Sequence, residues 1–500
     1  MNLYQVFRDR FETHLEQPFL ISPGDSICSY GDIDHLSACF ATALRQEGVK
    51  AGERVVVQVD KSAGAVALYL ACLRTGAVYV PLNVAYTATE VAYFLGDAAP
   101  ALFVCRPESA GQLEGIARQA GVPVIHTLGT SLDGSFGHLT HKLAPHKALT
   151  ERAPDDVVAM LYTSGTTGQS KGAMLTLENL ASNAVTLHEY WGFRPGDVLL
   201  HALPIFHVHG LFVALHCAML NASSVLFLSK FDTKEVRKAL PDATVMMGVP
   251  TFYTRLLACE EFNRKECLNI RLFISGSAPL TEQTFAEFEQ RTGHRILERY
   301  GMTETGMITS NPLDGERVAG TVGYALPGIE VRVAGESGEP LPPGEVGSVE
   351  LKGPNVFTGY WQMREKTAQE FRDDGFFISG DLGTLAENGR LTLVGRSRDL
   401  IISGGLNIYP KEIESVIDEL PGVVESAVIG VPHPDFGESM IAIVVANKDQ
   451  AASEASILKA TALQLARFKQ PRRVILVDEL PRNTMGKVQK NILRDRYSTW

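Results

Sequence analysis

The stretch "LYTSGTTGQSKGAM", from Leu161 to Met174, is the most informative part of this sequence. It continues the apolar run "VVAMLY", which predicts a buried strand that enters a loop. Glycines let the backbone turn tightly and approach a ligand closely, and the loop has them at Gly165, Gly168 and Gly172. It also carries hydroxyl donors and one positive charge, on Thr163, Ser164, Thr166, Thr167 and Lys171. This composition predicts a phosphate-binding loop.

Two other interpretations of this loop agree less well with the sequence. A Walker A loop requires a glycine directly before its lysine, whereas Ser170 precedes Lys171 here. A flexible linker is also rich in Gly, Ser and Thr. A linker rarely lies between a buried strand and an amphipathic helix, however, and we expect such a helix in "TLENLASNAVTLHEYW", capped by Thr176 and ended by Gly192. We therefore expect a nucleotide at this loop.

The composition excludes several classes of protein. The chain has 500 residues, 45% of them hydrophobic and 21% charged, as in ordinary globular proteins. Its net charge of −11 disfavours nonspecific binding to nucleic acid or to an anionic membrane. The longest apolar stretch is interrupted by Arg74 and Gly76, so we expect no membrane span. Seven scattered cysteines without a CxxC pair, and a start that does not resemble a secretory signal, predict a cytoplasmic location.

The pattern of predicted strands and helices changes twice along the chain. Short β-branched runs alternate with amphipathic helices from Glu53 to about residue 250, which predicts layered α/β architecture with mostly parallel sheets. Thr87 and Glu90 form a capping box for one of these helices. Alternating strands with tight turns follow from about Thr321 to Arg396, including a turn at Asn388 and Gly389. A compact α+β pattern then runs to the C-terminus, and we place the domain boundary near Arg398.

Three further motifs carry groups suited to a nucleotide. In "ERYGMTETG", Tyr300 offers a face for a base, Thr303 a donor for phosphate and Glu304 an oxygen for Mg²⁺, although a simple turn explains the motif equally well. In "FFISGDLG", Asp381 is able to accept both ribose hydroxyls or to pair with Arg396. Lys487, in "PRNTMGKVQK", is by itself an ordinary surface lysine. His207 and His209 have no further ligand at the spacing of a zinc site.

Taken together and in this order, these motifs resemble those of the ANL superfamily of adenylate-forming enzymes, which includes acyl-CoA and aryl-CoA synthetases. The resemblance covers essentially the whole chain, through "YTSGTTGQSKG", "YGMTE", "SGD", "GRSRD", "ISGGLNIYP" and "PRNTMGK". The stretches "ILERYGMTETGM", "LPIFHVHGLF", "MGVPTFYTRLL" and "RLFISGSAPL" look like those of the malonyl-CoA synthetases within the superfamily.

The resemblance implies an N-terminal adenylation domain over residues 1–397, with layered α/β sheets and a small antiparallel β-barrel-like part, and a mobile α+β lid over residues 398–500 that turns about Arg398. The family hinge is most often Asp or Lys, so this arginine departs from the pattern. The implied nucleotide-binding residues are Thr163, Ser164, Gly165, Thr166, Thr167, Gly168, Lys171, Ser277, Ala278, Pro279, Tyr300, Gly301, Met302, Thr303, Asp381 and Arg396. The implied residues around the acid are His207, Val208, Arg255, Ser275, Gly276 and Met307, with Gly404 and Gly405 lining a tunnel for coenzyme A.

The implied reaction converts malonate, ATP and coenzyme A into malonyl-CoA, AMP and pyrophosphate through a malonyl adenylate, with some activity on methylmalonate. Lys487, Thr303, Glu304 and His207 are the implied catalytic residues, and Glu304 the implied Mg²⁺ ligand. Arg255 is our candidate partner for the second carboxylate, against the alternative of a surface arginine. Whether a lysine acyltransferase modifies Lys487 stays open. The alternatives are a short-chain or aryl acyl-CoA synthetase, a stand-alone amino-acid adenylation domain, or a noncatalytic nucleotide-binding descendant.

Overall fold

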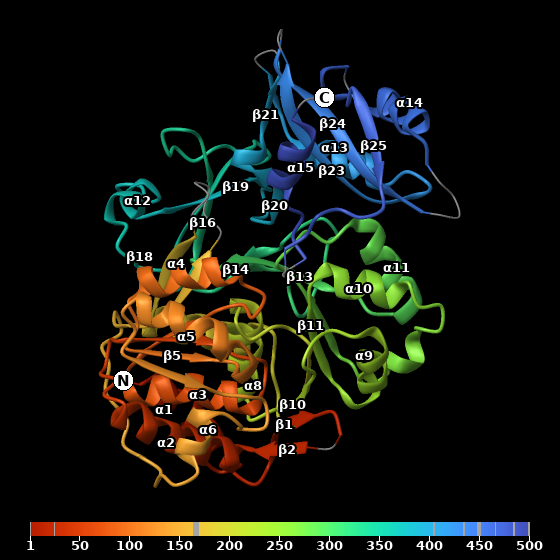
Figure 1. Cartoon of the computed structure of the whole chain (residues 1–500). Coiled ribbons are helices and arrows are strands. Elements are labelled where there is room, and N and C mark those ends of the chain that lie inside the picture. The colour runs from red at the N-terminus through yellow and green to blue at the C-terminus, as the bar shows by residue number, and fades with distance from the viewer. Residues whose placement is uncertain are drawn as a thin grey trace.

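The computed structural model describes residues 2–24, 26–163, 170–403, 406–433, 436–447, 452–465, 467–483 and 486–498. A large part holds the N-terminus, and a smaller C-terminal unit, blue in Figure 1, stands on top of it. The predicted residues Ser164, Gly165, Thr166, Thr167, Gly168, Gly404 and Gly405 lie outside the described residues.

The first of two large sheets follows the predicted α/β pattern. Its neighbouring strands β4, β3, β5 and β6 are parallel, and β4 also pairs in parallel with β7. The β-branched runs that form them are buried on both faces, as is usual for parallel strands covered by helices. In spatial order the strands are β18 (Gly359–Tyr360), β8 (Lys171–Thr176), β7 (Val157–Thr163), β4 (Val78–Pro81), β3 (Arg54–Gln58), β5 (Leu102–Cys105) and β6 (Val124–Thr127).

Lys171 does not lie within a loop. It begins strand β8, which pairs antiparallel with β7 so that Thr163 lies opposite Lys171. The prediction of a strand, a loop and then a helix therefore missed the intervening strand "KGAMLT", whose short apolar run looked like the entry to the helix.

The second sheet is parallel over its centre and antiparallel at both edges. Its strands are, in spatial order, β15 (Tyr324–Ala325), β14 (Gly306–Ser310), β13 (Leu297–Met302), β12 (Leu272–Ser275), β11 (Val245–Gly248), β9 (Val198–His201), β10 (Ser224–Phe227), β1 (Pro18–Ser22) and β2 (Ser26–Ser29). Because β12 and β13 are parallel neighbours, the segments that follow them start from the same edge of the sheet.

The helices of the large part include α3, which is buried along nearly its whole length and contacts α1 and α2. The predicted caps are confirmed at Thr87 of α4 and at Thr176 of α7. The helices are α1 (Leu3–Phe11), α2 (Tyr30–Gln46), α3 (Ala63–Thr75), α4 (Ala88–Ala98), α5 (Ala110–Gln119), α6 (Ser135–Thr140), α7 (Leu177–Tyr190), α8 (His216–Leu220), α9 (Thr233–Ala239), α10 (Pro250–Leu257), α11 (Glu282–Thr292) and α12 (Arg364–Gln369). Short 3-10 helices are η1 (Pro107–Ser109), η3 (Leu240–Asp242) and η4 (Arg264–Cys267).

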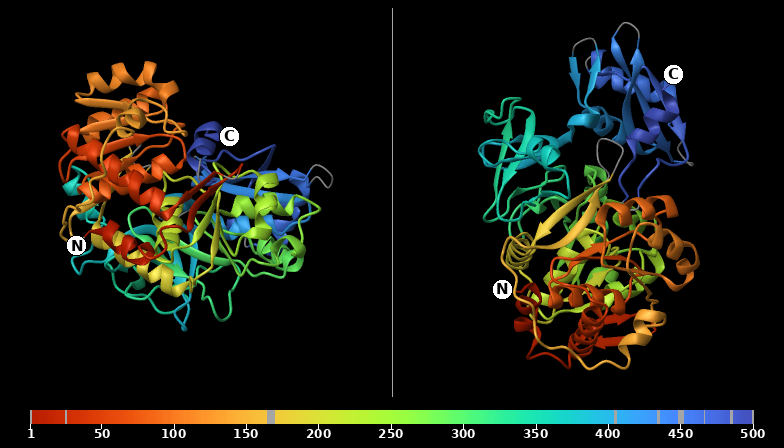
Figure 2. Two further views of the ribbon diagram at one scale, coloured as in Figure 1. Left: turned by 90° about the horizontal axis from the view of Figure 1, so that it is seen from below. Right: turned by 60° about the vertical axis from the view of Figure 1, so that its left-hand side comes forward.

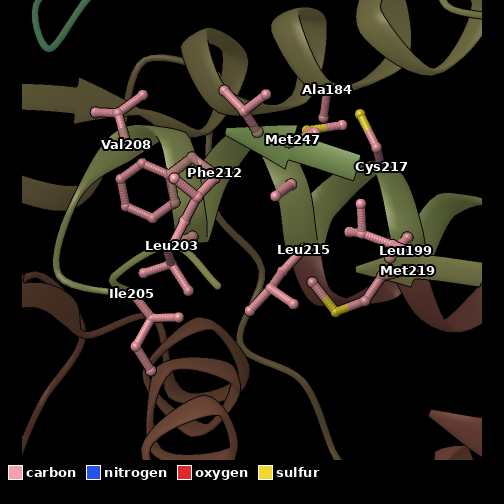
Figure 3. Close-up of a cluster of buried hydrophobic side chains, with 14 of the residues drawn as sticks. Ala184, Leu199, Leu203, Ile205, Val208, Phe212, Leu215, Cys217, Met219 and Met247 are labelled. Atoms are coloured by element: carbon pink, nitrogen blue, oxygen red, sulfur yellow. The ribbon is translucent and has the colours of Figure 1, made fainter. Parts of the chain in front are cut away.

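One hydrophobic core extends across both large sheets. Figure 3 shows part of it, where Leu203, Val208 and Phe212 approach one another beside strand residues such as Met247. Phe212 belongs to η2 (His209–Leu215), a π-helical segment that continues directly into α8. π-helical turns are rare and are frequently found at functional sites.

The predicted antiparallel region is a four-stranded sheet. Its strands are β16 (Glu330–Ala334), β17 (Gly347–Lys352), β19 (Phe377–Leu385) and β20 (Leu391–Arg396), and each pairs antiparallel with the next. The turn at Asn388 and Gly389 joins β19 to β20, with Gly389 at a φ of +82°. In the described residues the outer strands β16 and β20 are not paired with each other, so the sheet is open and not a closed barrel.

The C-terminal unit has the predicted α+β composition. Its sheet contains β22 (Leu406–Ile408), β21 (Ile401–Ser403), β24 (Gly437–Ala446), β23 (Val423–His433) and β25 (Arg473–Val477), and its helices are η5 (Ser397–Asp399), α13 (Pro410–Asp418), α14 (Glu454–Gln464), η6 (Arg467–Lys469) and α15 (Lys490–Tyr497). Two hydrophobic clusters pack within this unit, separately from the large core. In the right view of Figure 2 it stands above the large part.

All seven cysteines are free, and Cys39, Cys72, Cys105, Cys217 and Cys267 are buried. Burial raises the pKa of the Cys105 thiol to about 11 and that of the Cys267 thiol to about 12. In the part of the chain that the structure describes, no helix is both long and apolar enough to cross a membrane.

Candidate active site

The candidate site lies where the ends of β12, β13 and β20 meet a loop of the C-terminal unit. Asp381 and Arg396 lie opposite each other on β19 and β20, and Arg396 Nε is 2.7 Å from Asp381 Oδ1. The other carboxylate oxygen of Asp381 accepts a hydrogen bond from the Tyr300 hydroxyl. The two interpretations of Asp381 are thus both open, since it pairs with Arg396 and still lies at the site.

Glu304 follows β13 and is buried, with an exposed fraction of 6%. Its Oε1 accepts a hydrogen bond of 3.0 Å from the Tyr360 hydroxyl, and burial raises the pKa of its carboxyl group. No ion pair to Glu304 occurs among the described residues, nor do they contain a group of three acidic, His or Cys side chains that could hold a metal. A single buried carboxylate suits Mg²⁺, which keeps most of its ligands as water and substrate phosphate.

Lys487 reaches this site from the C-terminal unit. Its backbone N–H donates to Asn483 Oδ1 at 2.9 Å, in a turn where Gly486 has a φ of +75°. The turn lies against α10, because a Cβ at Gly486 would be 3.2 Å from Thr251 Oγ1. Burial and the charge of Arg396 lower the pKa of Lys487 to about 8. The C-terminal unit thus places its ammonium group near the Asp381–Arg396 pair.

His207 lies within range of the charge of Lys487. Its Nδ1 accepts the backbone N–H of His209 at 3.3 Å, which leaves Nε2 as the protonated nitrogen of a neutral ring. Burial, with the charges of Lys487 and Arg299, lowers the pKa of His207 to about 3. The imidazole is therefore neutral at physiological pH.

Lys61 and His201 hold the segment around His207 in place. Lys61 Nζ lies 2.7 Å from His201 Nδ1, and His201 Nε2 lies 2.8 Å from the Gly210 carbonyl oxygen. A Cβ at Gly210 would be only 2.0 Å from the Pro204 carbonyl oxygen, so the backbone packs closely there. The start of η2 is consequently fixed at a defined position beside the site.

Arg299 is the functional candidate that sequence reasoning missed. It is 2% exposed, and its Nε and Nη2 atoms have no hydrogen-bond partner in the described part of the chain. The guanidinium lies against Gly276, where a Cβ would be 2.5 Å from its Cζ. Burial lowers the pKa of Arg299 to about 9. An arginine within the buried strand run "RILERYG" was the available signal, since buried arginines are rare without a partner.

Among the residues that the structure describes, no carboxylate forms an ion pair with Arg299. Glu298 is buried, and burial raises its pKa to about 8, so it is mostly protonated at neutral pH. Its Oε1 accepts from the Leu280 N–H at 3.1 Å. Ser275, at the end of β12, is also buried, and its hydroxyl has no hydrogen-bond partner among the described residues. The polar groups on this side of the site are therefore unsatisfied by the described protein.

The remaining predicted residues are distributed over the same region, with one exception. Val208 and Met307 are buried, and Gly276, Ser277, Ala278 and Pro279 follow β12 directly. Gly301 and Met302 end β13, Thr303 follows it, and Thr163 ends β7. Lys171 is buried beside Glu370, 3.6 Å from its Oε1, and over the Tyr360 ring. The exception is Arg255, which is exposed on α10 and whose charge acts on Arg482 of the C-terminal unit.

Comparisons with known proteins agree with this geometry. The family described as AMP-binding enzyme matches residues 7–361, and its C-terminal domain matches residues 412–487. A malonate–CoA ligase of Arabidopsis thaliana is 35% identical over 89% of this chain and 78% of its own. The structure of ATP-bound MatB from Rhodopseudomonas palustris is 50% identical, with a TM-score of 0.97 over 100% of this chain and 99% of that one. Apo MatB from the same organism, 51% identical over the same shares, has a TM-score of 0.86.

Proposed function

Because the chain belongs to the AMP-binding enzyme family, as an acid–thiol ligase, we propose that it is a malonyl-CoA synthetase. It joins malonate to ATP, forming malonyl adenylate and pyrophosphate, and then transfers the malonyl group to the sulfur of coenzyme A, releasing AMP. The name of the Arabidopsis thaliana relative supports malonate as the acid. The observation that carries the proposal is the buried and unpartnered guanidinium of Arg299.

A dicarboxylate brings a second negative charge into a closed pocket, where an unpaired charge is strongly disfavoured. Arg299 offers two unsatisfied nitrogen donors there, Nε and Nη2, and the adjoining face of Gly276 leaves no side chain in the way. Arg255 is exposed and lies toward the C-terminal unit, so we assign the second carboxylate to Arg299 in its place. Bidentate pairing of a planar guanidinium with a carboxylate is the geometry that arginine favours.

The first step forms a bond between a malonate carboxylate oxygen and the α-phosphorus of ATP, and breaks the bond from that phosphorus to the bridging oxygen of pyrophosphate. Two anions must approach each other, so cationic groups are needed to hold them and to stabilise the transferring centre. Lys487 supplies an ammonium group beside Asp381 and Arg396, which we assign to the ribose. Mg²⁺ held by Glu304 would neutralise phosphate charge when bound. Residues 163–168, Lys171 and the loop of residues 276–279 would hold the rest of ATP.

We further propose that the unit from Arg398 onward is a lid that turns between the two steps. The higher TM-score with ATP-bound MatB than with apo MatB supports an adenylate-forming arrangement here, with Lys487 inserted. Rotation would withdraw Lys487 and admit coenzyme A past His207, with Gly404 and Gly405 facing the thiol. A lysine acyltransferase would reach Lys487 only after this rotation. An Arg398→Pro variant restricts the hinge dihedral, so pyrophosphate exchange should persist while thioester formation falls.

The experiment that tests the substrate measures AMP formation with malonate, methylmalonate, acetate, propionate and benzoate, with and without coenzyme A. We expect malonate to give the highest kcat/KM. Methylmalonate adds one methyl group near Val208 and Met307, which is worth about 1–3 kcal/mol of discrimination, so moderate activity agrees with the proposal. Preference for acetate or benzoate would instead favour a short-chain or aryl acyl-CoA synthetase. The seven free cysteines lead us to propose a cytoplasmic location.

A further inference from the structure

Ser277 has a backbone conformation that L-amino acids rarely adopt. Its φ is +72°, in the left-handed region that favours glycine. Ala99 shares a positive φ, but it ends α4, where such a conformation is common. Ser277 instead follows the end of β12, within the loop of residues 276–279 that we assign to ATP. A non-glycine residue in this region is strained and persists only where its surroundings hold it.

The group that holds Ser277 is His209. Its Nδ1 lies 3.3 Å from the Ser277 hydroxyl, which is within hydrogen-bond distance. The His209 ring is fully buried, and its Nε2 has no hydrogen-bond partner, so Ser277 provides its hydrogen bond among the described residues. Burial lowers the pKa of His209 well below its usual value, so the ring is neutral.

His209 itself is held rigidly. It begins η2, and the neighbouring Gly210 carbonyl oxygen is 2.8 Å from His201 Nε2, whose ring is bound by Lys61. The backbone also packs against the Pro204 carbonyl oxygen at Gly210. A fixed imidazole is able to resist relaxation of the strained Ser277 backbone.

We propose that His209 is a positioning residue for nucleotide binding: its ring holds Ser277 in the left-handed conformation, and so sets the course of the loop of residues 276–279. The same link joins the segment that carries His207 to the segment that carries the nucleotide. The inference rests on the proposed function for the role of this loop, and its experiment leaves malonate out.

The test compares two substitutions of Ser277. Ser277→Ala keeps the Cβ strain and removes the hydroxyl, whereas Ser277→Gly removes the hydroxyl and the strain together. Titration calorimetry with Mg·ATP should show Ser277→Ala binding about five- to tenfold more weakly than the wild-type protein. Ser277→Gly should bind at least about threefold more tightly than Ser277→Ala. Equal affinities of the two variants would overturn the proposal, because a direct contact of the hydroxyl with ATP is lost in both.

A second set of variants tests the histidine. His209→Phe should weaken ATP binding as Ser277→Ala does, and adding Ser277→Gly to His209→Phe should recover most of the loss. A double variant no tighter than His209→Phe would contradict the inference. His216→Phe is the matched control, since His216 is another fully buried histidine that follows η2 and pairs with the Tyr69 hydroxyl at 2.8 Å.

The outcomes separate this inference from the proposed function. If His209→Phe does not fold, the two Ser277 variants still test the proposal, because both leave His209 itself unsubstituted and equal ATP affinities would show that the strain at Ser277 does not affect nucleotide binding. Absence of ATP binding in the wild-type protein would count against the proposed function itself. ATP binding without use of malonate would remove the substrate assignment and leave the role of His209 standing.

Discussion

The two halves of the candidate site differ in how far the protein satisfies its own charges. On the nucleotide half, Arg396 is paired with Asp381 at 2.7 Å, and Asp381 also accepts from Tyr300. On the acid half, Arg299 is more deeply buried, and its Nε and Nη2 have no hydrogen-bond partner among the described residues. We propose from this difference that the nucleotide half is assembled before any ligand binds, whereas the acid half is completed only by its substrate. Unsatisfied buried groups of this kind make a site reject ligands that cannot pair with them.

Removing the cation between the two halves should have the largest effect. Lys487→Ala should lower the rate of adenylate formation about 10²- to 10³-fold, because a group that stabilises the transition-state charge is lost. Thioester formation from supplied malonyl adenylate should change little, since the lid has then withdrawn Lys487. Separate rate measurements of adenylate formation and of thioester formation test this prediction. An equal loss in both would show that Lys487 serves both steps.

The next largest effect concerns the acid half alone. Arg299→Met should lower kcat/KM for malonate by at least about 100-fold, since removing one partner of a buried ion pair costs about 3–5 kcal/mol. Acetate and propionate, which leave no second carboxylate unpaired, should be affected much less.

Arg255→Met is the matched control, as it removes an exposed arginine of the same chemistry from α10. It should leave the preference for malonate over acetate unchanged. A larger loss of malonate efficiency in Arg255→Met than in Arg299→Met would restore the original assignment of the second carboxylate to Arg255.

A smaller effect follows from the pKa of Lys487, which burial lowers to about 8. The ammonium form predominates below this pH, and the neutral amine above it. We therefore expect kcat/KM for adenylate formation to fall as pH rises through about 8, approaching tenfold per pH unit. Rates of the first half-reaction between pH 6 and 10 test this, and thioester formation from supplied adenylate should show no such fall.

The smallest effects are on stability, and they should have opposite signs. Arg299→Met removes a buried charge that has no partner, so the ligand-free protein should melt about 2 °C higher or more. Arg396→Met leaves the buried Asp381 carboxylate without its cation, so the Tm should fall by at least about 4 °C. Thermal denaturation without ligands measures both. Two shifts of the same sign would show that the halves do not differ in the way described.

The comparison also shows what the sequence alone was able to predict. The sheets, the caps at Thr87 and Thr176 and the turn at Asn388 follow local patterns of apolar and turn residues, and these predictions are confirmed. The motifs that we assign to the nucleotide half were recognisable from their residue types and their order along the chain, although Tyr300, Asp381 and Arg396 lie on strands.

The acid half was harder to predict because its chemistry depends on which charges lack partners. Arg299 and Arg255 are both arginines near apolar residues, and the sequence does not state that one is buried without a partner and the other exposed. That distinction arises only when β12 and β13 pair and bring Gly276 against the guanidinium. Strand β8 was missed for a related reason, since its pairing with β7 is fixed by tertiary contacts.

The burial of the cysteines has a consequence for chemoselectivity. A malonyl adenylate is a mixed anhydride that acylates thiolates, and the proposed reaction requires it to wait for the thiolate of coenzyme A. Burial holds the pKa of Cys105 at about 11 and that of Cys267 at about 12, so these sulfurs remain protonated and poorly nucleophilic. Burial raises the pKa values of the Cys72 and Cys217 thiols further still. Acylation of these buried cysteines by the adenylate is therefore disfavoured relative to acylation of coenzyme A.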